Sequence, residues 1–255
     1  MLAELILIAC LGLVAGLSIG CIGIGGVIVV PALVYIGGLP IEIAIAAAMM
    51  GYILTGLIGT FVFAGNKSIN WQMAGWLSAA AMPAAMFGAW LSNNIPGVAL
   101  ETIIGLLTMV SGVNTLLSRE HDGATAGTLG RGKLVSIGGA TGVLSAITGT
   151  GGPLVLVPVM LWLQVPVLTA IGLSQAVQLP IATLATIGNF TFGSPDLAIG
   201  LILGAGLAIG SYGGAQLAHK LPRQGLKKMV ASVLVIIGLI IITRGLANLL
   251  GLSFT

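Results

Sequence analysis

The sequence has 255 residues, of which 57% are hydrophobic and only 6% are charged, and its formal net charge is +3. Soluble domains carry roughly 25% charged residues, so this composition excludes a soluble domain. Long apolar runs dominate the sequence, and they predict an all-α polytopic protein that crosses a lipid bilayer several times. The basic residues cluster in loops between these runs, where they report membrane orientation and do not indicate nucleic-acid binding.

Polar or turn-forming breaks divide the chain into eight apolar runs. They cover residues 2–38, 41–64, 71–91, 98–117, 134–163, 167–192, 197–218 and 229–250. Six runs have a suitable length for one membrane-spanning helix, which needs ~20 residues. The first and fifth runs are too long for one crossing, and a glycine-rich motif interrupts each of them. We therefore expect each to bend back as a hairpin or re-entrant pair of segments.

The two halves of the chain are related by a nearly constant offset of 126 residues, as between Gly25 and Gly151. The same offset relates Pro40 to Pro166 and Pro96 to Pro222. This register predicts an internal duplication with a first membrane repeat at 1–118, a cytoplasmic linker at 119–133 and a second membrane repeat at 134–255.

The basic residues favour one orientation of these repeats. If each glycine-broken run returns to the side from which it started, all but Arg244 of the lysines and arginines lie on one membrane face. If each broken run crosses only once, the remaining eight divide evenly between the faces, against the positive-inside rule. The sequence thus predicts two inverted repeats of about five segments each, in the cell (inner) membrane, with both termini extracytoplasmic.

The glycine-rich motifs are the predicted substrate site. A helix that begins inside the membrane exposes unpaired N–H groups and a partial positive charge, and glycine lets an anion approach that backbone closely. Glycine-interrupted segments at matching positions of inverted repeats indicate a transporter site. Thr148 and Thr150 add hydroxyls in the second copy, where the first copy has Ile22 and Ile24. The predicted substrate-binding residues are Ser18, Gly23, Gly25, Gly26, Ser145, Thr148, Gly149, Thr150, Gly151, Gly152, Pro153 and Gln175.

Structural roles are an alternative for several of these residues. The glycines of the motifs can serve close helix packing alone, as we expect for the series Gly12/Gly16/Gly20 and Gly206/Gly210/Gly214. Ser18, Ser145, Gln175 and Gln178 are either site residues or partners in interhelical hydrogen bonds. Glu42 is expected in a first helical turn near the membrane surface, or else it is the carboxylate that couples ions.

The sequence contains no arrangement typical of an enzyme, a metal site or a bound cofactor. His121 and His219 stand in loops without triad or metal spacing around them. Transport without an ATPase element must be driven by a gradient or by another subunit. A monoanion that leaves a negative-inside cell gains ~2.3 kcal/mol per 100 mV, which allows export without a buried proton relay.

A duplicated G-x-G-G-(x)-P element and near-equal halves resemble the TauE/SafE family of sulfite exporters. The resemblance covers residues 12–246 and rests on Gly23, Gly25, Gly26 and Pro31, and on Gly149, Gly151, Gly152 and Pro158. Val27 and Pro153 stand where the family's usual third glycine would be. The resemblance implies transport of sulfite, a sulfonate or a related sulfur-containing anion, in the outward direction.

We therefore expect a transporter of a small anion that works by alternating access around the two glycine motifs. An anion channel of the same architecture, a structural membrane subunit and a cation transporter are the alternatives. The sequence leaves the oligomeric state open, including a homo-oligomer.

Overall fold

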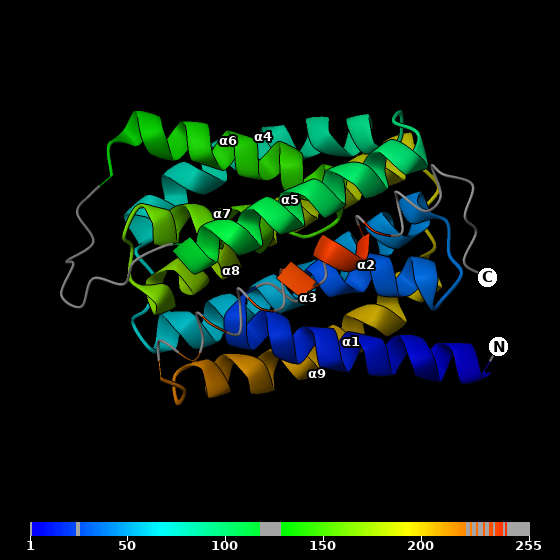
Figure 1. The fold of residues 1–255 in the computed structure, drawn as a ribbon, viewed down its shortest axis with the longest axis horizontal. Coiled ribbons are helices and arrows are strands. Elements are labelled where there is room, and N and C mark those ends of the chain that lie inside the picture. Colours follow the sequence, from blue (N-terminus) through cyan, green and yellow to red (C-terminus); the bar gives the residue numbers. More distant parts are fainter. Residues whose placement is uncertain are drawn as a thin grey trace.

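The computed structural model of the chain describes residues 2–23, 26–117 and 129–222, together with separate positions between 225 and 243. The described part is all-helical (Figure 1). Its helices are α1 (Leu2–Ile22), α2 (Gly26–Tyr35), α3 (Ile41–Gly65), α4 (Trp71–Ser92), α5 (Gly97–Leu117), α6 (Arg131–Thr148), α7 (Pro153–Trp162), α8 (Val167–Phe192) and α9 (Leu197–Ala218).

The helices follow the apolar runs that the sequence predicts. Each long run is two helices, α1 with α2 and α6 with α7, which confirms the predicted interruptions. Polar residues between the apolar runs cap the helices that follow them. The Asn70 side chain accepts a hydrogen bond from the Met73 N–H at the start of α4. Asp196 does the same for two N–H groups of α9. The predicted run at 229–250 lies largely outside the described residues.

Within the described residues, five helices are long and apolar enough to cross a membrane, namely α1, α3, α4, α8 and α9. Helices α2 and α7 have only 10 residues each, about 15 Å, or half of a ~30 Å hydrocarbon core. Figure 1 shows that α2 runs back toward the end of the bundle at which α1 begins. The chain thus reverses direction at the first glycine motif.

Small residues bring two pairs of helices into close contact, α1 with α9 and α4 with α6. A Cβ on Gly12 would lie 2.7 Å from the Leu203 carbonyl oxygen, and one on Gly16 would clash with the Leu207 carbonyl oxygen. Cβ atoms on Gly138 and Gly142 would clash in the same way with carbonyl oxygens of α4. The packing role predicted for the glycines spaced by four is therefore confirmed, because only glycine permits this backbone approach.

The contacts in one half recur in the other half at the 126-residue offset. Gly12 meets Leu203, and their counterparts Gly138 and Leu77 meet each other. Helix α3 packs on α9 as α8 packs on α4. Helices α3 and α8, which correspond to each other, also pack together: Gly56 approaches Leu179 and Gly59 approaches Gln175, so these two helices run antiparallel. The two halves thus pack through equivalent surfaces.

The charged residues of the described part separate to opposite ends of the bundle. The Ser68 hydroxyl lies 3.2 Å from His219 Nε2, which brings the α3–α4 turn beside the end of α9. The Arg131 guanidinium lies 5.3 Å from the centre of the Trp76 ring at the same end. The basic end carries Lys67, Arg131, Lys133 and Lys220, whereas Glu42, Glu101 and Asp196 stand near the starts of α3, α5 and α9 at the other end.

Candidate functional site: two glycine turns in the middle of the bundle

The two glycine motifs form turns that only glycine adopts readily. Gly23 follows α1 with φ of +78°. Gly149 ends α6 in the left-handed conformation, and Gly151 and Gly152 follow with φ of +75° and +119°. Pro153 is the first residue of α7, where its missing N–H costs nothing. Gly25 lies outside the described residues, so its predicted role stays a prediction.

The two turns meet in the buried middle of the protein. A Cβ on Gly26 would lie only 2.6 Å from the Thr150 carbonyl oxygen. Tyr52 of α3 contacts both turns: its hydroxyl donates to the Gly26 carbonyl oxygen at 3.1 Å, and its ring would lie 2.7 Å from a Cβ on Gly151. Tyr52 is completely buried. It therefore holds the two glycine turns against each other.

The hydroxyl pair of the second turn is buried and internally bonded. Thr148 Oγ1 donates to the Leu144 carbonyl oxygen at 2.7 Å and lies 2.9 Å from Thr150 Oγ1. Because the Thr148 hydroxyl donates its hydrogen to the Leu144 carbonyl oxygen, the Thr150 hydroxyl is the donor in the hydrogen bond between the two threonines. Either hydroxyl must therefore exchange an existing hydrogen bond before it can donate to a substrate.

Two glutamines of α8 face the turns. Gln175 Nε2 donates to the Ile19 carbonyl oxygen at 2.8 Å, and Gln178 Nε2 donates to Thr55 Oγ1 at 2.7 Å. Their Oε1 atoms are buried and have no hydrogen-bond partner among the described residues. Each glutamine thus makes the interhelical hydrogen bond considered from the sequence, and each keeps a free acceptor.

Two hydroxyls of α6 complete a polar wall next to the second turn. Ser145 and Thr141 are fully buried, and their oxygens have no hydrogen-bond partner among the described residues. The Ser145 carbonyl oxygen accepts the N–H groups of Gly149 and Thr150, which fixes Ser145 at the turn. A buried polar group without a partner costs about 1–3 kcal/mol, so several of them around one turn indicate a place for a ligand or water.

Ser18 has a different environment from Ser145. It is half-buried, and its hydroxyl donates to the Val14 carbonyl oxygen of its own helix at 3.1 Å. At the 126-residue offset the counterpart of Ser145 is Ile19. The suggested role of Ser18 in binding stays a prediction.

Two helices end and two helices begin at this site. The Ile19 carbonyl oxygen of α1 accepts Gly23 N–H and Gln175, and the Ser145 carbonyl oxygen of α6 accepts two N–H groups, so these C-terminal ends are partly satisfied. The N-cap of α7, Gly152, offers no side-chain hydrogen bond. Helices α2 and α7 both begin here, and a helix N-terminus attracts anions.

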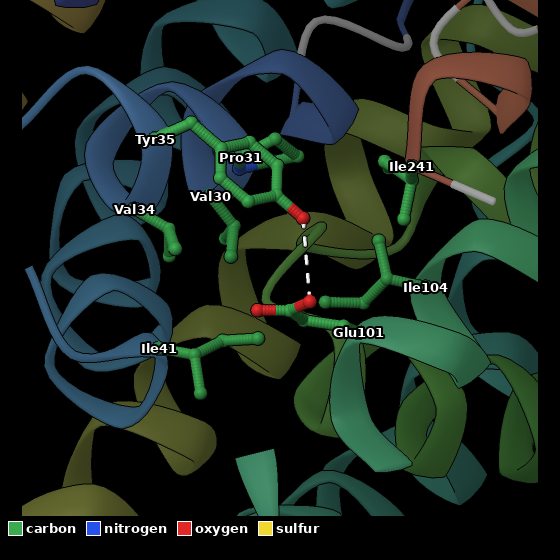
Figure 2. A pocket seen from close by; sticks show the side chains of 8 residues that line it. All are labelled: Val30, Pro31, Val34, Tyr35, Ile41, Glu101, Ile104 and Ile241. Carbon is green, nitrogen blue, oxygen red and sulfur yellow. Dashed lines mark hydrogen bonds between the residues drawn. The ribbon is translucent and has the colours of Figure 1, made fainter. Parts of the chain in front are cut away.

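A separate small pocket lies between α2, α5 and Ile241 (Figure 2), and its lining residue Val30 also packs against Gly149 of the second turn. Val30, Val34 and Ile104 line its apolar walls. The Tyr35 hydroxyl donates to Glu101 Oε2 across it at 3.4 Å. Glu101 is a half-buried carboxylate that the sequence pattern did not single out beside Glu42.

Sequence reasoning also missed Tyr52, Thr55 and Thr141. The 126-residue offset offered one signal, because Tyr52 is the counterpart of Gln178. Two polar residues at corresponding positions of two apolar helices mark a place where both helices face the same site.

A bundle of membrane-crossing helices with two half-length helices that begin at a buried polar centre is the architecture of a membrane transport protein. The comparisons with known proteins agree. The family model described as "Sulfite exporter TauE/SafE" matches residues 8–241, and the chain belongs to this family.

The curated relatives bear the name of probable membrane transporter proteins. The chain is 26% identical to the probable membrane transporter protein YdhB of Bacillus subtilis, over 89% of this chain and 96% of the relative. It is 23% identical to the probable membrane transporter protein MJ0441 of Methanocaldococcus jannaschii, over 92% and 96%. No solved structure matches. The protein is therefore a multi-pass membrane transporter and not an enzyme.

Proposed function

We propose that the protein carries a small sulfur-containing anion, sulfite or an organosulfonate, out of the cell. The observation that carries this proposal is the meeting of two helix N-termini, at Gly26 and Gly152, beside buried polar groups without partners. The sulfur chemistry follows from the family's description, which names sulfite.

The second glycine turn would hold the anion. Gly151 and Gly152 bring no Cβ to the N-terminus of α7, where Tyr52 and Ile181 pack against them, and the Ser145 and Thr141 hydroxyls can donate to sulfonyl or sulfite oxygens. No Asp or Glu occurs among the described residues that contact the two turns, so no carboxylate there repels an anion. The lack of carboxylates among these residues disfavours the cation-transporter alternative.

Alternating access would arise from two inverted repeats. The recurrence of contacts at the 126-residue offset supports a two-fold relation between the halves. A two-fold axis that exchanges the antiparallel helices α3 and α8 lies perpendicular to them, which places it in the membrane plane. One repeat can then rock against the other around the central site.

The orientation follows from the ends of the bundle. We place the basic end, with Lys67 and Lys220, at the cytoplasm, in accordance with the positive-inside rule. Helix α1 begins at the acidic end, so the N-terminus would be extracytoplasmic, and inverted repeats would bring the C-terminus to the same side. The membrane would be the cell (inner) membrane.

Flux measurements on the purified protein in proteoliposomes test this function. Efflux of sulfite and ethanesulfonate should saturate with concentration, show counterflow and increase with a membrane potential that expels anions. Conductance that does not saturate would instead establish a channel. The absence of both flux and anion binding would favour a structural subunit.

A pair of serine variants links the flux to the site. Ser145→Ala should reduce transport, because it removes an unpartnered buried hydroxyl at the turn. Ser136→Ala on the same helix is the matched control, since its exposed hydroxyl bonds only to the Gly132 carbonyl oxygen of α6. Equal flux in both variants would contradict the site assignment.

A further inference from the structure

A cleft with a volume of about 400 Å³ opens between the C-terminal ends of α3 and α9, away from the glycine turns. Phe61 and Asn66 line it from the α3 side. Tyr212, Gln216, His219 and Lys220 line it from the α9 side. The transport mechanism makes no use of this cleft.

The cleft is apolar at one end and polar at the other. Phe61 and Tyr212 form the apolar walls, and they are 78% and 53% exposed on the outer surface of the bundle. The exposed residue Gln216 lies one turn further along α9, and the exposed Lys220 lies in the turn that follows the end of this helix. From Tyr212 to its end at Ala218 the helix rises about 9 Å, so the cleft extends from the level of the acyl chains toward the headgroups.

The polar end offers donors and positive charge. Gln216 and Lys220 have no hydrogen-bond partner or ion pair among the described residues. His219 forms a fixed part of the wall, because its ring nitrogens lie 2.9 Å from the Ala215 carbonyl oxygen and 3.2 Å from Ser68 Oγ. The cleft opens at the basic end of the bundle, so it complements an anionic group.

The corresponding place at the opposite end lacks this character. At the 126-residue offset, Asn93 and Asn94 replace His219 and Lys220, and Trp90 replaces Gln216. Asn93 Nδ2 donates to Asn189 Oδ1 at 3.0 Å. The charged cleft therefore belongs to one face of the membrane only.

We propose that this cleft binds the headgroup of an anionic phospholipid, with the phosphodiester at Lys220 and Gln216 and an acyl chain along Phe61 and Tyr212. Tyr212 suits the membrane interface because it combines an apolar ring with a polar hydroxyl, and Phe61 offers an apolar ring to the acyl chain. A lysine at the surface contributes about 1 kcal/mol to binding of an anionic lipid, which corresponds to about a fivefold change in affinity.

Native mass spectrometry of the delipidated protein, titrated with phosphatidylglycerol, phosphatidylcholine or glycerol phosphate, tests this proposal. Phosphatidylglycerol should bind in preference to phosphatidylcholine, and Lys220→Asn should weaken its binding about fivefold. The matched control is Lys133→Asn, which removes the same charge from an exposed position at the same end, outside the cleft.

Several outcomes would overturn the lipid site. If Lys133→Asn and Lys220→Asn weakened phosphatidylglycerol binding equally, the lipid would be held by diffuse attraction to the basic surface and not by the cleft. Equal binding of phosphatidylcholine would remove the role of charge. Binding of glycerol phosphate as tightly as phosphatidylglycerol would make the cleft a site for free anions. Phe61→Ala tests the apolar wall separately. It should weaken phosphatidylglycerol binding although no positive charge is removed, and unchanged binding would contradict an acyl chain along Phe61.

Discussion

The two glycine turns share a backbone arrangement, but the side chains around them differ. A Cβ on Gly23 would meet Val157 and Ile171, and one on Gly149 would meet the nearly equivalent pair Val30 and Ile45. The helix before the second turn carries three buried hydroxyls, on Thr141, Ser145 and Thr148, where the first helix has Ala15, Ile19 and Ile22. Small residues thus set the packing that both turns share, whereas these three buried hydroxyls occur only in the helix before the second turn, where we propose that the anion binds.

The largest expected effect comes from filling the second turn. Gly151→Leu should abolish transport while leaving the protein inserted in the membrane, because the turn holds this residue at φ of +75°, which leucine rarely adopts, and the new side chain would collide with the Tyr52 ring. Efflux from proteoliposomes, normalised to inserted protein, is the measurement. Gly139→Leu is the control, since a Cβ at Gly139 of α6 meets nothing within 4 Å. If Gly151→Leu retained the wild-type flux, the second turn would not be part of the transport path.

The shared packing can be disturbed separately from the site. Gly16→Ala and its counterpart Gly142→Ala should each lower the free energy of unfolding by about 1–3 kcal/mol, because each Cβ meets a backbone carbonyl oxygen of the facing helix. Thermal unfolding in detergent measures the loss. Similar losses of stability in the two variants would support the structural equivalence of the halves, and a loss in only one variant would contradict it.

The hydroxyl difference between the turns predicts a smaller effect. Ser145→Ala should leave the stability within about 0.5 kcal/mol of the wild type, since the hydroxyl has no protein partner to lose. Its apparent substrate affinity should fall about threefold to tenfold, the usual worth of one hydrogen bond. Concentration-dependent efflux and thermal unfolding report the two quantities on one preparation. A large loss of stability with unchanged affinity would make Ser145 a packing residue.

The smallest effect is expected at the hydrogen bond between Tyr35 and Glu101. Glu101→Gln should change transport by less than about twofold, because an amide oxygen can still accept the hydrogen bond from Tyr35. This follows from export driven by the membrane potential without a buried proton relay. Efflux rates at several pH values provide the measurement. Loss of a pH-dependent component in Glu101→Gln would instead make Glu101 a coupling residue.

The extent of the helices was predictable from local properties of the sequence. Apolar length, glycine interruption and capping residues such as Asn70 and Asp196 act within a few residues, and the helices begin and end close to the predicted runs. The two breaks were predictable for the same reason, because a run longer than a membrane is thick must turn. The offset of 126 residues also anticipated which contacts recur.

The polar lining of the site was only partly predictable, because it depends on contacts between distant segments. Tyr52 looks like a core aromatic residue in the sequence, and only the approach of both turns gives it a role. Thr141 lies in an apolar helix, and nothing local shows that its hydroxyl would be buried without a partner. Glu101 gains its significance from Tyr35, which lies on another helix.

Equilibrium binding to the purified protein tests the central claim most directly. Isothermal titration with sulfite and with ethanesulfonate should show saturable binding to the wild type and to Gly139→Leu, and none to Gly151→Leu. Sodium and potassium should bind to none of them at the same site. Undiminished anion binding by Gly151→Leu, or a preference of the wild type for a cation, would contradict an anion site at the second glycine turn.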